Sequence, residues 1–138
     1  MKRRTPVSEI MSTDIIALRR SDTLERAEKL FKKHKIRHIP VVSNESILGM
    51  LSYTDLLRIS FADATDDEYG VDTVVYNMFS LEQVMTKNLI SVSSDTTIKE
   101  VAEILSKNEF HALPVVDDSL LVGIVTTTDL INYLLKQF

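Results

Sequence analysis

The chain contains two copies of one sequence pattern, aligned without a gap by a shift of 74 positions, from 11 to 85. The matched pairs include Met11 and Met85, Pro40 and Pro114, Gly49 and Gly123, and Asp55 and Asp129. A duplicated unit of this size typically folds as two half-domains that complete each other's core. The space between two such halves is a natural place for a ligand.

Composition limits the classes of protein that the chain can represent. With 138 residues and 44% apolar residues, one compact, two-lobed domain is expected. The net charge of −4 argues against nucleic-acid binding, although Arg3, Arg4, Arg19 and Arg20 are basic. Cysteine is absent, which excludes disulfides, thiolate catalysis and cysteine-rich metal sites. No signal core or membrane-spanning apolar run is present, so we expect a cytoplasmic protein.

The first copy predicts a β-α-β-β-α order of elements. Asp22 with Glu25 is predicted to cap the first helix, and Thr54 the closing helix. The remaining predicted elements are a turn at Ser8–Met11, a strand at Ile15–Leu18, a helix with Leu24, Ala27, Leu30 and Phe31 on one face, and a hairpin of strands Ile39–Val42 and Ile47–Ser52.

The second copy predicts the same order. Ser80 and Gln83 have the spacing of a capping box, and Thr128 is predicted to cap the closing helix. The other elements are a turn at Leu81–Met85, a strand at Leu89–Val92, a helix with Ile98, Val101, Ile104 and Leu105 on one face, and strands Leu113–Val116 and Leu120–Thr126. Gly49 and Gly123 lie inside strands, where glycine often marks the close approach of another backbone or a ligand. The predicted fold class is α/β, of the α+β type.

We divide the chain into repeat 1 at 7–60, a linker at 61–80 and repeat 2 at 81–136. The linker begins with acidic residues that predict a solvated loop without metal-site spacing, and continues with an apolar stretch read as helical. Together with the apolar C-terminal segment ending at Phe138, it gives more apolar surface than two small lobes need. A second copy of the chain is the simplest partner for such a surface.

Each copy ends its last strand with hydroxyl side chains and opens a helix with a carboxylate. The residues are Ser52, Thr54 and Asp55 in the first copy, and Thr126, Thr128 and Asp129 in the second. A carboxylate in a first helical turn is favoured by the helix dipole, which is one explanation of the pattern. The other is binding of a vicinal diol such as that of a ribose, because a carboxylate accepts hydrogen bonds.

A phosphate attached to such a ribose would need cations elsewhere. Arg37 and His38 precede the first proline-containing strand, and His111 occupies the matching place in the second copy. The guanidinium of arginine suits phosphate, and histidine can add a donor. The alternative is that these are exposed turn residues after a helix.

Metal binding and catalysis have little support in the sequence. His34 and His38 are four residues apart, but a helix is predicted to end between them and no third ligand follows. No nucleophile elbow, phosphate-binding glycine loop or paired carboxylates at a recognisable spacing are present. We therefore expect neither an enzyme nor a required cofactor.

These residues together resemble the cystathionine-beta-synthase (CBS) domain, and the pair resembles the tandem arrangement called a Bateman module. The resemblance rests on a Met-ending turn, an apolar-Pro-Val-Val strand and Gly-apolar-apolar-Ser/Thr-x-x-Asp, all in both copies. It covers about residues 7 to 136 and suggests a freestanding module. It implies two three-stranded sheets packed about a pseudo-twofold axis, with adenosine-containing ligands bound in two clefts.

The resemblance also implies a role for each site residue. In the first cleft Asp55 would take the ribose, with Ser52 and Thr54 on ribose or phosphate and Arg37 and His38 facing the phosphate. Ile16 would present its backbone to the base, with Ile39 and Pro40 as an apolar wall. The second cleft would use Asp129, Thr126, Thr128, His111, Ile90, Leu113 and Pro114. Ala112 replaces the second cationic position there, which weakens the case for phosphate unless Arg37 also serves the second cleft.

The sequence thus predicts a non-catalytic regulatory module that binds an adenine nucleotide and signals to an effector protein by a shift in conformational populations. AMP, ADP or ATP is the first expectation, with S-adenosylmethionine or a cyclic dinucleotide as other ligands. The alternative is a ligand-free dimerisation or scaffolding module, a homodimer formed through the linker and C-terminal helices.

Overall fold

The computed structural model describes residues 4–62 and 78–138, and forms two compact units. The first-repeat unit lies within Ile16–Asn88, and the second-repeat unit combines the chain up to Ile15 with Leu89–Phe138. The units therefore differ from the two copies in the sequence. Each unit takes the segment that opens the other copy. The predicted acidic loop and most of the predicted linker helix lie outside the described residues.

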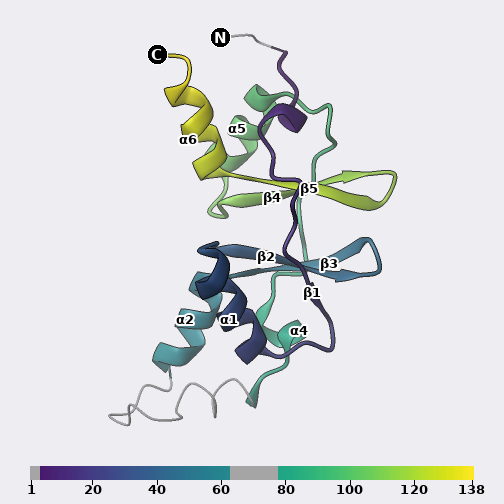
Figure 1. The fold of residues 1–138 in the computed structure, drawn as a ribbon, viewed down its shortest axis with the longest axis vertical. Coiled ribbons are helices and arrows are strands. Elements are labelled where there is room, and N and C mark those ends of the chain that lie inside the picture. Colours follow the sequence, from purple (N-terminus) through teal and green to yellow (C-terminus); the bar gives the residue numbers. More distant parts are fainter. Residues whose placement is uncertain (1–3, 63–77) are drawn as a thin grey trace. The chain divides into compact units, whose positions relative to one another are not determined.

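The first-repeat unit is a three-stranded sheet with its helices on one face (Figure 1). Strand β1 is parallel to β2, and β2 is antiparallel to β3. The elements are β1 (Leu18–Arg19), α1 (Leu24–His34), β2 (His38–Ser43), β3 (Ser46–Ser52), α2 (Tyr53–Ala62) and α4 (Leu81–Val84). The predicted order of β-α-β-β-α is confirmed, with α4 added from the second copy.

The second-repeat unit has the same plan but a smaller sheet of two antiparallel strands. Its elements are the 3-10 helix η1 (Val7–Glu9), α5 (Ile98–Lys107), β4 (Ala112–Asp117), β5 (Leu120–Thr126) and α6 (Thr127–Leu135). In Figure 1 the purple N-terminal segment passes beside β5, to which Ser12 forms a two-way backbone bridge at Ile124.

The apolar faces predicted for the two long helices form the cores. In α1, Leu24, Ala27 and Phe31 are buried, and in α5, Ile98, Val101 and Leu105 are buried. The first core consists of Leu18, Leu24, Ala27, Phe31, Ile39, Val41, Leu51, Leu56, Leu81 and Met85. The second consists of Val7, Val92, Val101, Leu105, Leu113, Val115 and Val125. Leu81 and Met85 in the first core, and Val7 in the second, come from exchanged segments.

The strand glycines make room for the exchanged segments. A Cβ atom at Gly49 would lie 2.7 Å from Met85 Sδ and 2.8 Å from the Thr86 carbonyl oxygen. At Gly123 it would lie 2.6 Å from Met11 Sδ and 3.1 Å from the Ser12 carbonyl oxygen. Backbone bridges join Met50 to Thr86 and Ser12 to Ile124 beside these contacts. The predicted close approach at both glycines is confirmed, and the approaching group is the protein's own chain.

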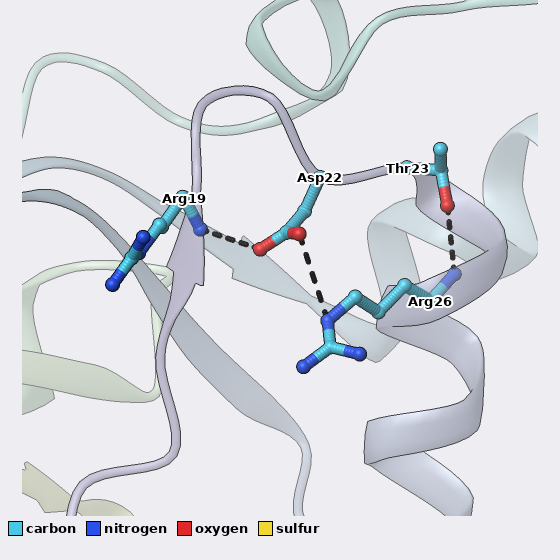
Figure 2. Close-up of polar contacts among 4 residues, drawn as sticks. All are labelled: Arg19, Asp22, Thr23 and Arg26. Atoms are coloured by element: carbon cyan, nitrogen blue, oxygen red, sulfur yellow. Dashed lines mark hydrogen bonds and ion pairs between the residues drawn. The ribbon is translucent and has the colours of Figure 1, made fainter.

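The predicted cap of the first helix was wrong by one residue. Thr23 is the N-cap of α1, because its hydroxyl accepts a hydrogen bond of 3.1 Å from the Arg26 amide (Figure 2). Asp22 instead accepts from the Arg19 amide at 2.7 Å and lies 3.6 Å from the Arg26 Nε. Asp22 therefore holds the turn between β1 and α1. The capping box of Ser80 and Gln83 at α4 is confirmed.

The short strands that open each copy also differ from expectation. The predicted strand at Ile15–Leu18 is displaced to β1 at Leu18–Arg19. The predicted strand at Leu89–Val92 is reduced to a parallel bridge between Val92 and Val115. The implied third strand of the second sheet is therefore absent as a strand among the described residues. The Ser94 amide donates to Asp117 Oδ1 at 3.0 Å and ties this segment to the end of β4.

We predict that Gly49→Ala and Gly123→Ala each destabilise the protein by about 1–3 kcal/mol, the usual cost of overpacking. At Gly123 the closest contact is a flexible thioether, whereas at Gly49 the Thr86 carbonyl is also too close. Met11→Ala should therefore restore more of the stability lost in Gly123→Ala than Met85→Ala restores in Gly49→Ala. Urea denaturation of both double-mutant cycles measures the coupling. Unchanged stability in both glycine variants would contradict the close packing.

We also predict an acid-sensitive contribution from Asp117. Hydrogen bonds from the Ser94 hydroxyl and the Ser94 amide hold the pKa of Asp117 below its ordinary value of 3.8. A carboxyl whose pKa is lower in the folded state stabilises the fold above the unfolded pKa, and this stabilisation is lost as the pH falls through the folded pKa. As the pH falls below about 3.8, the free energy of unfolding should therefore decrease less in the Asp117→Asn variant than in the parent protein.

Urea denaturation of both proteins across an acidic pH series measures this difference. Asp118→Asn is the control, because it removes the same charge at the neighbouring exposed position. Equal pH slopes for Asp117→Asn and the parent protein would refute the assignment.

Candidate functional site

The end of β3 and the start of α2 form a reciprocal pair of hydrogen bonds. The Ser52 hydroxyl accepts from the Asp55 amide at 3.1 Å, and Asp55 Oδ2 accepts from the Ser52 amide at 3.2 Å. We call this pair the first box. The predicted cap at Thr54 is therefore wrong: Ser52 caps the helix, and Thr54 is an exposed residue of the first turn. A hydroxyl that directly ends the strand is placed to bond the amide three residues on.

The second-repeat unit contains the same arrangement at the start of α6. The Thr126 hydroxyl accepts from the Asp129 amide at 3.1 Å, and Asp129 Oδ2 accepts from the Thr126 amide at 2.9 Å. We call this pair the second box. Thr126 is the N-cap, so the predicted cap at Thr128 is also wrong. Thr128 is exposed, as its counterpart in the first copy is.

The hairpin brings the predicted cationic positions to the boxes. The Tyr53 amide donates to the Arg37 carbonyl oxygen at 2.8 Å, and His38 pairs with Ser52 in the sheet. In the second-repeat unit the Thr127 amide donates to the His111 carbonyl oxygen at 3.0 Å. Residues fourteen or more positions apart in the sequence therefore meet at one end of each hairpin.

The apolar site residues lie at the same end of each sheet. Ile16 precedes β1, which is parallel to β2, and Ile90 precedes Val92, which forms a parallel bridge to β4. The side chains of Ile39 and Leu113 belong to the two hydrophobic cores, and Pro40 and Pro114 are buried beside them. Ile16 is half-buried and Ile90 is exposed.

Arg58 is a residue of this region that the sequence analysis missed. Its Nη1 lies 3.8 Å from Asp55 Oδ1, and its side chain is 75% exposed. The i,i+3 spacing of Asp55 and Arg58 on one helix is a signal that could have identified it. The exposed ion pair contributes little stability, so the guanidinium can turn toward another anion at small cost.

The boxes cap their helices but leave carboxylate oxygens that can accept further hydrogen bonds. Each aspartate uses Oδ2 to accept a backbone amide, while a carboxylate offers two oxygens and about four lone-pair sites. The Asp55 side chain is 18% exposed, which is enough for contact with a ligand. Each aspartate can therefore hold its helix and still accept hydrogen bonds from a hydroxyl pair.

Two further features bear on the class of site. Within residues 4–62 and 78–138, no group of three or more His, Cys, Asp or Glu side chains is placed to hold a metal ion. His34 ends α1 and His38 opens β2, with Lys35 in a left-handed conformation between them. No helix in the described part of the chain combines the length and apolar character needed to cross a membrane.

Two repeats of one plan, each with a hairpin between two helices and a hydroxyl–carboxylate box at its end, define a tandem module of one repeated domain. The sequence pattern of the CBS domain matches residues 7–62 and 81–136. The chain therefore belongs to the CBS domain family, and the resemblance drawn from the sequence is confirmed.

Two similar proteins differ in how much of their own length this chain matches. The chain is 31% identical over 136 residues to a homoserine O-acetyltransferase of Methanohalobium evestigatum, covering 97% of this chain but 25% of that protein. It is 27% identical to the CBS domain-containing protein YhcV of Bacillus subtilis, covering 90% of this chain and 81% of YhcV. The chain thus spans about a quarter of the first relative and most of the second.

The CBS domain pair of protein MJ0100 is a similar solved structure. The likeness has a TM-score of 0.80 and 27% identity, and covers 97% of this chain and 98% of that one. That structure is a complex with 5′-methylthioadenosine and S-adenosyl-L-methionine.

Proposed function

We propose that this chain is a non-catalytic regulatory module that binds adenosine-containing ligands at its two boxes. The observation that carries the proposal is the duplicated placement of Asp55 and Asp129 at the hairpin ends, beside Arg37 and His111 respectively. A carboxylate beside exposed donors suits a ribose that carries a charged or polar 5′ group.

The MJ0100 pair supports the choice of ligand class, since both of its bound compounds contain adenosine. AMP, ADP or ATP is our first choice for this chain, because Arg37, His38 and Arg58 give the first box donors that suit phosphate. S-adenosylmethionine and cyclic dinucleotides that contain adenosine are the next candidates.

Regulation follows from binding only through unequal affinity for different conformations. A ligand that binds two conformations of the module equally shifts neither. A tenfold preference is worth about 1.4 kcal/mol. An effector protein would then bind preferentially to the conformation that the ligand favours.

We predict that Asp55→Asn weakens AMP binding at the first box by about 1.5–3 kcal/mol, the value of a charge-assisted hydrogen bond, which is about tenfold or more. Asparagine keeps an oxygen that can accept the Ser52 amide, so the helix start should be preserved. Isothermal titration calorimetry measures the affinity, and thermal unfolding checks the fold.

Asp22→Asn is the matched control for this experiment. Asp22 also accepts a backbone amide before a helix (Figure 2). It follows β1, which is parallel to β2, whereas Arg37 precedes β2, so the two lie at opposite ends of the sheet. Its substitution should leave AMP affinity unchanged. Equal AMP affinities for Asp55→Asn and the parent protein would reject the first box as the ribose site.

A second candidate function is self-association, as a scaffold in which the boxes serve only as helix caps. The observation that favours it is an exposed apolar stripe at the C-terminal end. Its members are Ile131, Leu134 and Leu135, at helical i, i+3 and i+4 spacing on α6, followed by Phe138 beyond the end of the helix. Leu135 is 64% exposed and Phe138 is 96% exposed, and such surface is typical of an interface.

We predict that the chain forms a homodimer that Leu135→Glu weakens, because a carboxylate buried in an apolar interface would lack a partner. Sedimentation velocity over a concentration series measures the association. Gln137→Glu adds the same charge nearby at an exposed polar position and should leave the dimer intact. A parent protein that stays monomeric throughout the series would reject this surface as a dimer interface.

A further inference from the structure

The two boxes have the same hydrogen bonds but differ in the charged residues that flank them in the sequence. Four basic residues that flank the first box are replaced in the second copy. Arg37 corresponds to His111, Arg58 to Asn132 and Lys35 to Glu109, while His38 corresponds to Ala112. The aspartates and the capping hydroxyls are kept. The first copy thus has three permanent cations, Lys35, Arg37 and Arg58, at positions where the second copy has none.

The structure links two of these positions directly to the first box. Arg58 Nη1 is 3.8 Å from Asp55 Oδ1, and the Arg37 backbone is hydrogen-bonded to Tyr53, the residue after the capping Ser52. In the second-repeat unit His111 occupies the place of Arg37 and is bonded to Thr127 in the same way. No basic side chain within the described residues forms an ion pair with Asp129.

Cations beside a box favour a ligand with a negatively charged 5′ group, and their absence favours a ligand without one. A phosphate beside Asp129 would meet a carboxylate, with no permanent cation at the positions matched to Arg37 and Arg58 to offset the repulsion. A phosphate beside Asp55 would lie near the Arg58 guanidinium, and the exposed Arg37 side chain starts from a backbone bonded to Tyr53. Both guanidinium groups can form paired hydrogen bonds with a phosphate. The adenosine part can bind at both boxes, because the ribose-binding carboxylate is common to both.

We propose that the two boxes have different ligand classes: the first takes a phosphorylated adenosine compound, and the second takes an adenosine derivative without a phosphate. This assignment rests on the proposed function, since it presumes that both boxes bind adenosine. Arg37 and Arg58 are the specificity-determining residues. A single chain would then respond to a nucleotide and to an uncharged or cationic nucleoside at the same time.

The test is a nuclear magnetic resonance titration that follows the backbone amides of Ser52–Asp55 and of Thr126–Asp129 separately. AMP and 5′-methylthioadenosine are the two probes, because they share the adenosine part and differ in the phosphate. The first box should prefer AMP by about tenfold or more, as expected for loss of a charge-assisted contact. The second box should bind 5′-methylthioadenosine at least as well as AMP.

Exchanging the residues between the copies makes the test reciprocal. Arg37→His with Arg58→Asn should abolish the AMP preference of the first box while leaving 5′-methylthioadenosine affinity there within about twofold. His111→Arg with Asn132→Arg should raise AMP affinity at the second box by about tenfold. All four substitutions introduce the residue found at the matched position of the other copy.

Lys99→Gln is the control for a change in total charge, since Lys99 is exposed and lies on α5. It should change neither preference. Added salt should weaken AMP at the first box far more than 5′-methylthioadenosine, because exposed charges are screened.

The outcomes separate this inference from the proposed function. If both boxes bind both probes with the same preference, or if the exchanges leave the preferences unchanged, the two-class assignment is overturned and the proposed function stands. If neither probe binds at either box, both are overturned.

Discussion

The close approach of two methionine-containing segments to two strand glycines is the contact on which the rest of the structure depends. Met85 lies over Gly49 and Met11 over Gly123, with the following backbone bridged to the neighbouring strand residue in both cases. A glycine is needed there because a Cβ atom would overlap both a thioether and, at Gly49, a carbonyl oxygen. Through these contacts each compact unit is completed by a segment from the other copy of the sequence.

This packing changes the meaning of the pattern in which a glycine precedes each aspartate by six residues. The glycine admits the exchanged segment, the next residue bridges to it, and the strand ends two residues later in the capping hydroxyl. The spacing is therefore a consequence of strand length and helix capping. The proposal of a ligand then depends on groups that have no role in the fold. These groups are the second oxygen of each carboxylate and the cations near Asp55. Arg37 and Arg58 are exposed and are therefore accessible to the ligand that we propose.

Much of the fold could be predicted because its signals are local. The hairpins are bounded by polar turns, and the apolar faces of α1 and α5 follow the helical period, so their core residues were identified correctly. The position of β1 was predicted incorrectly because a strand of two residues is too short to show an alternating pattern in the sequence. The caps were misassigned where two suitable residues compete, as with Asp22 and Thr23, because the choice depends on backbone geometry. The exchange of segments could not be read from the sequence, since a repeat does not show which core its first turn will join.

The structure brings together the predicted site residues at the hairpin ends, and their role in ligand binding stays a prediction. The boxes and the cationic turn before β2 were found by comparing the two copies, and Arg58 was missed because only matched residues were compared. The difference between the copies is as informative as their likeness, since it carries the proposed ligand specificity. The most direct test of the central claim is to crystallise the protein with AMP and determine the structure of the complex. The account predicts the ribose hydroxyls on the Asp55 carboxylate with the phosphate beside Arg37 and Arg58. AMP bound away from Asp55, or a phosphate turned away from both arginines, would contradict it.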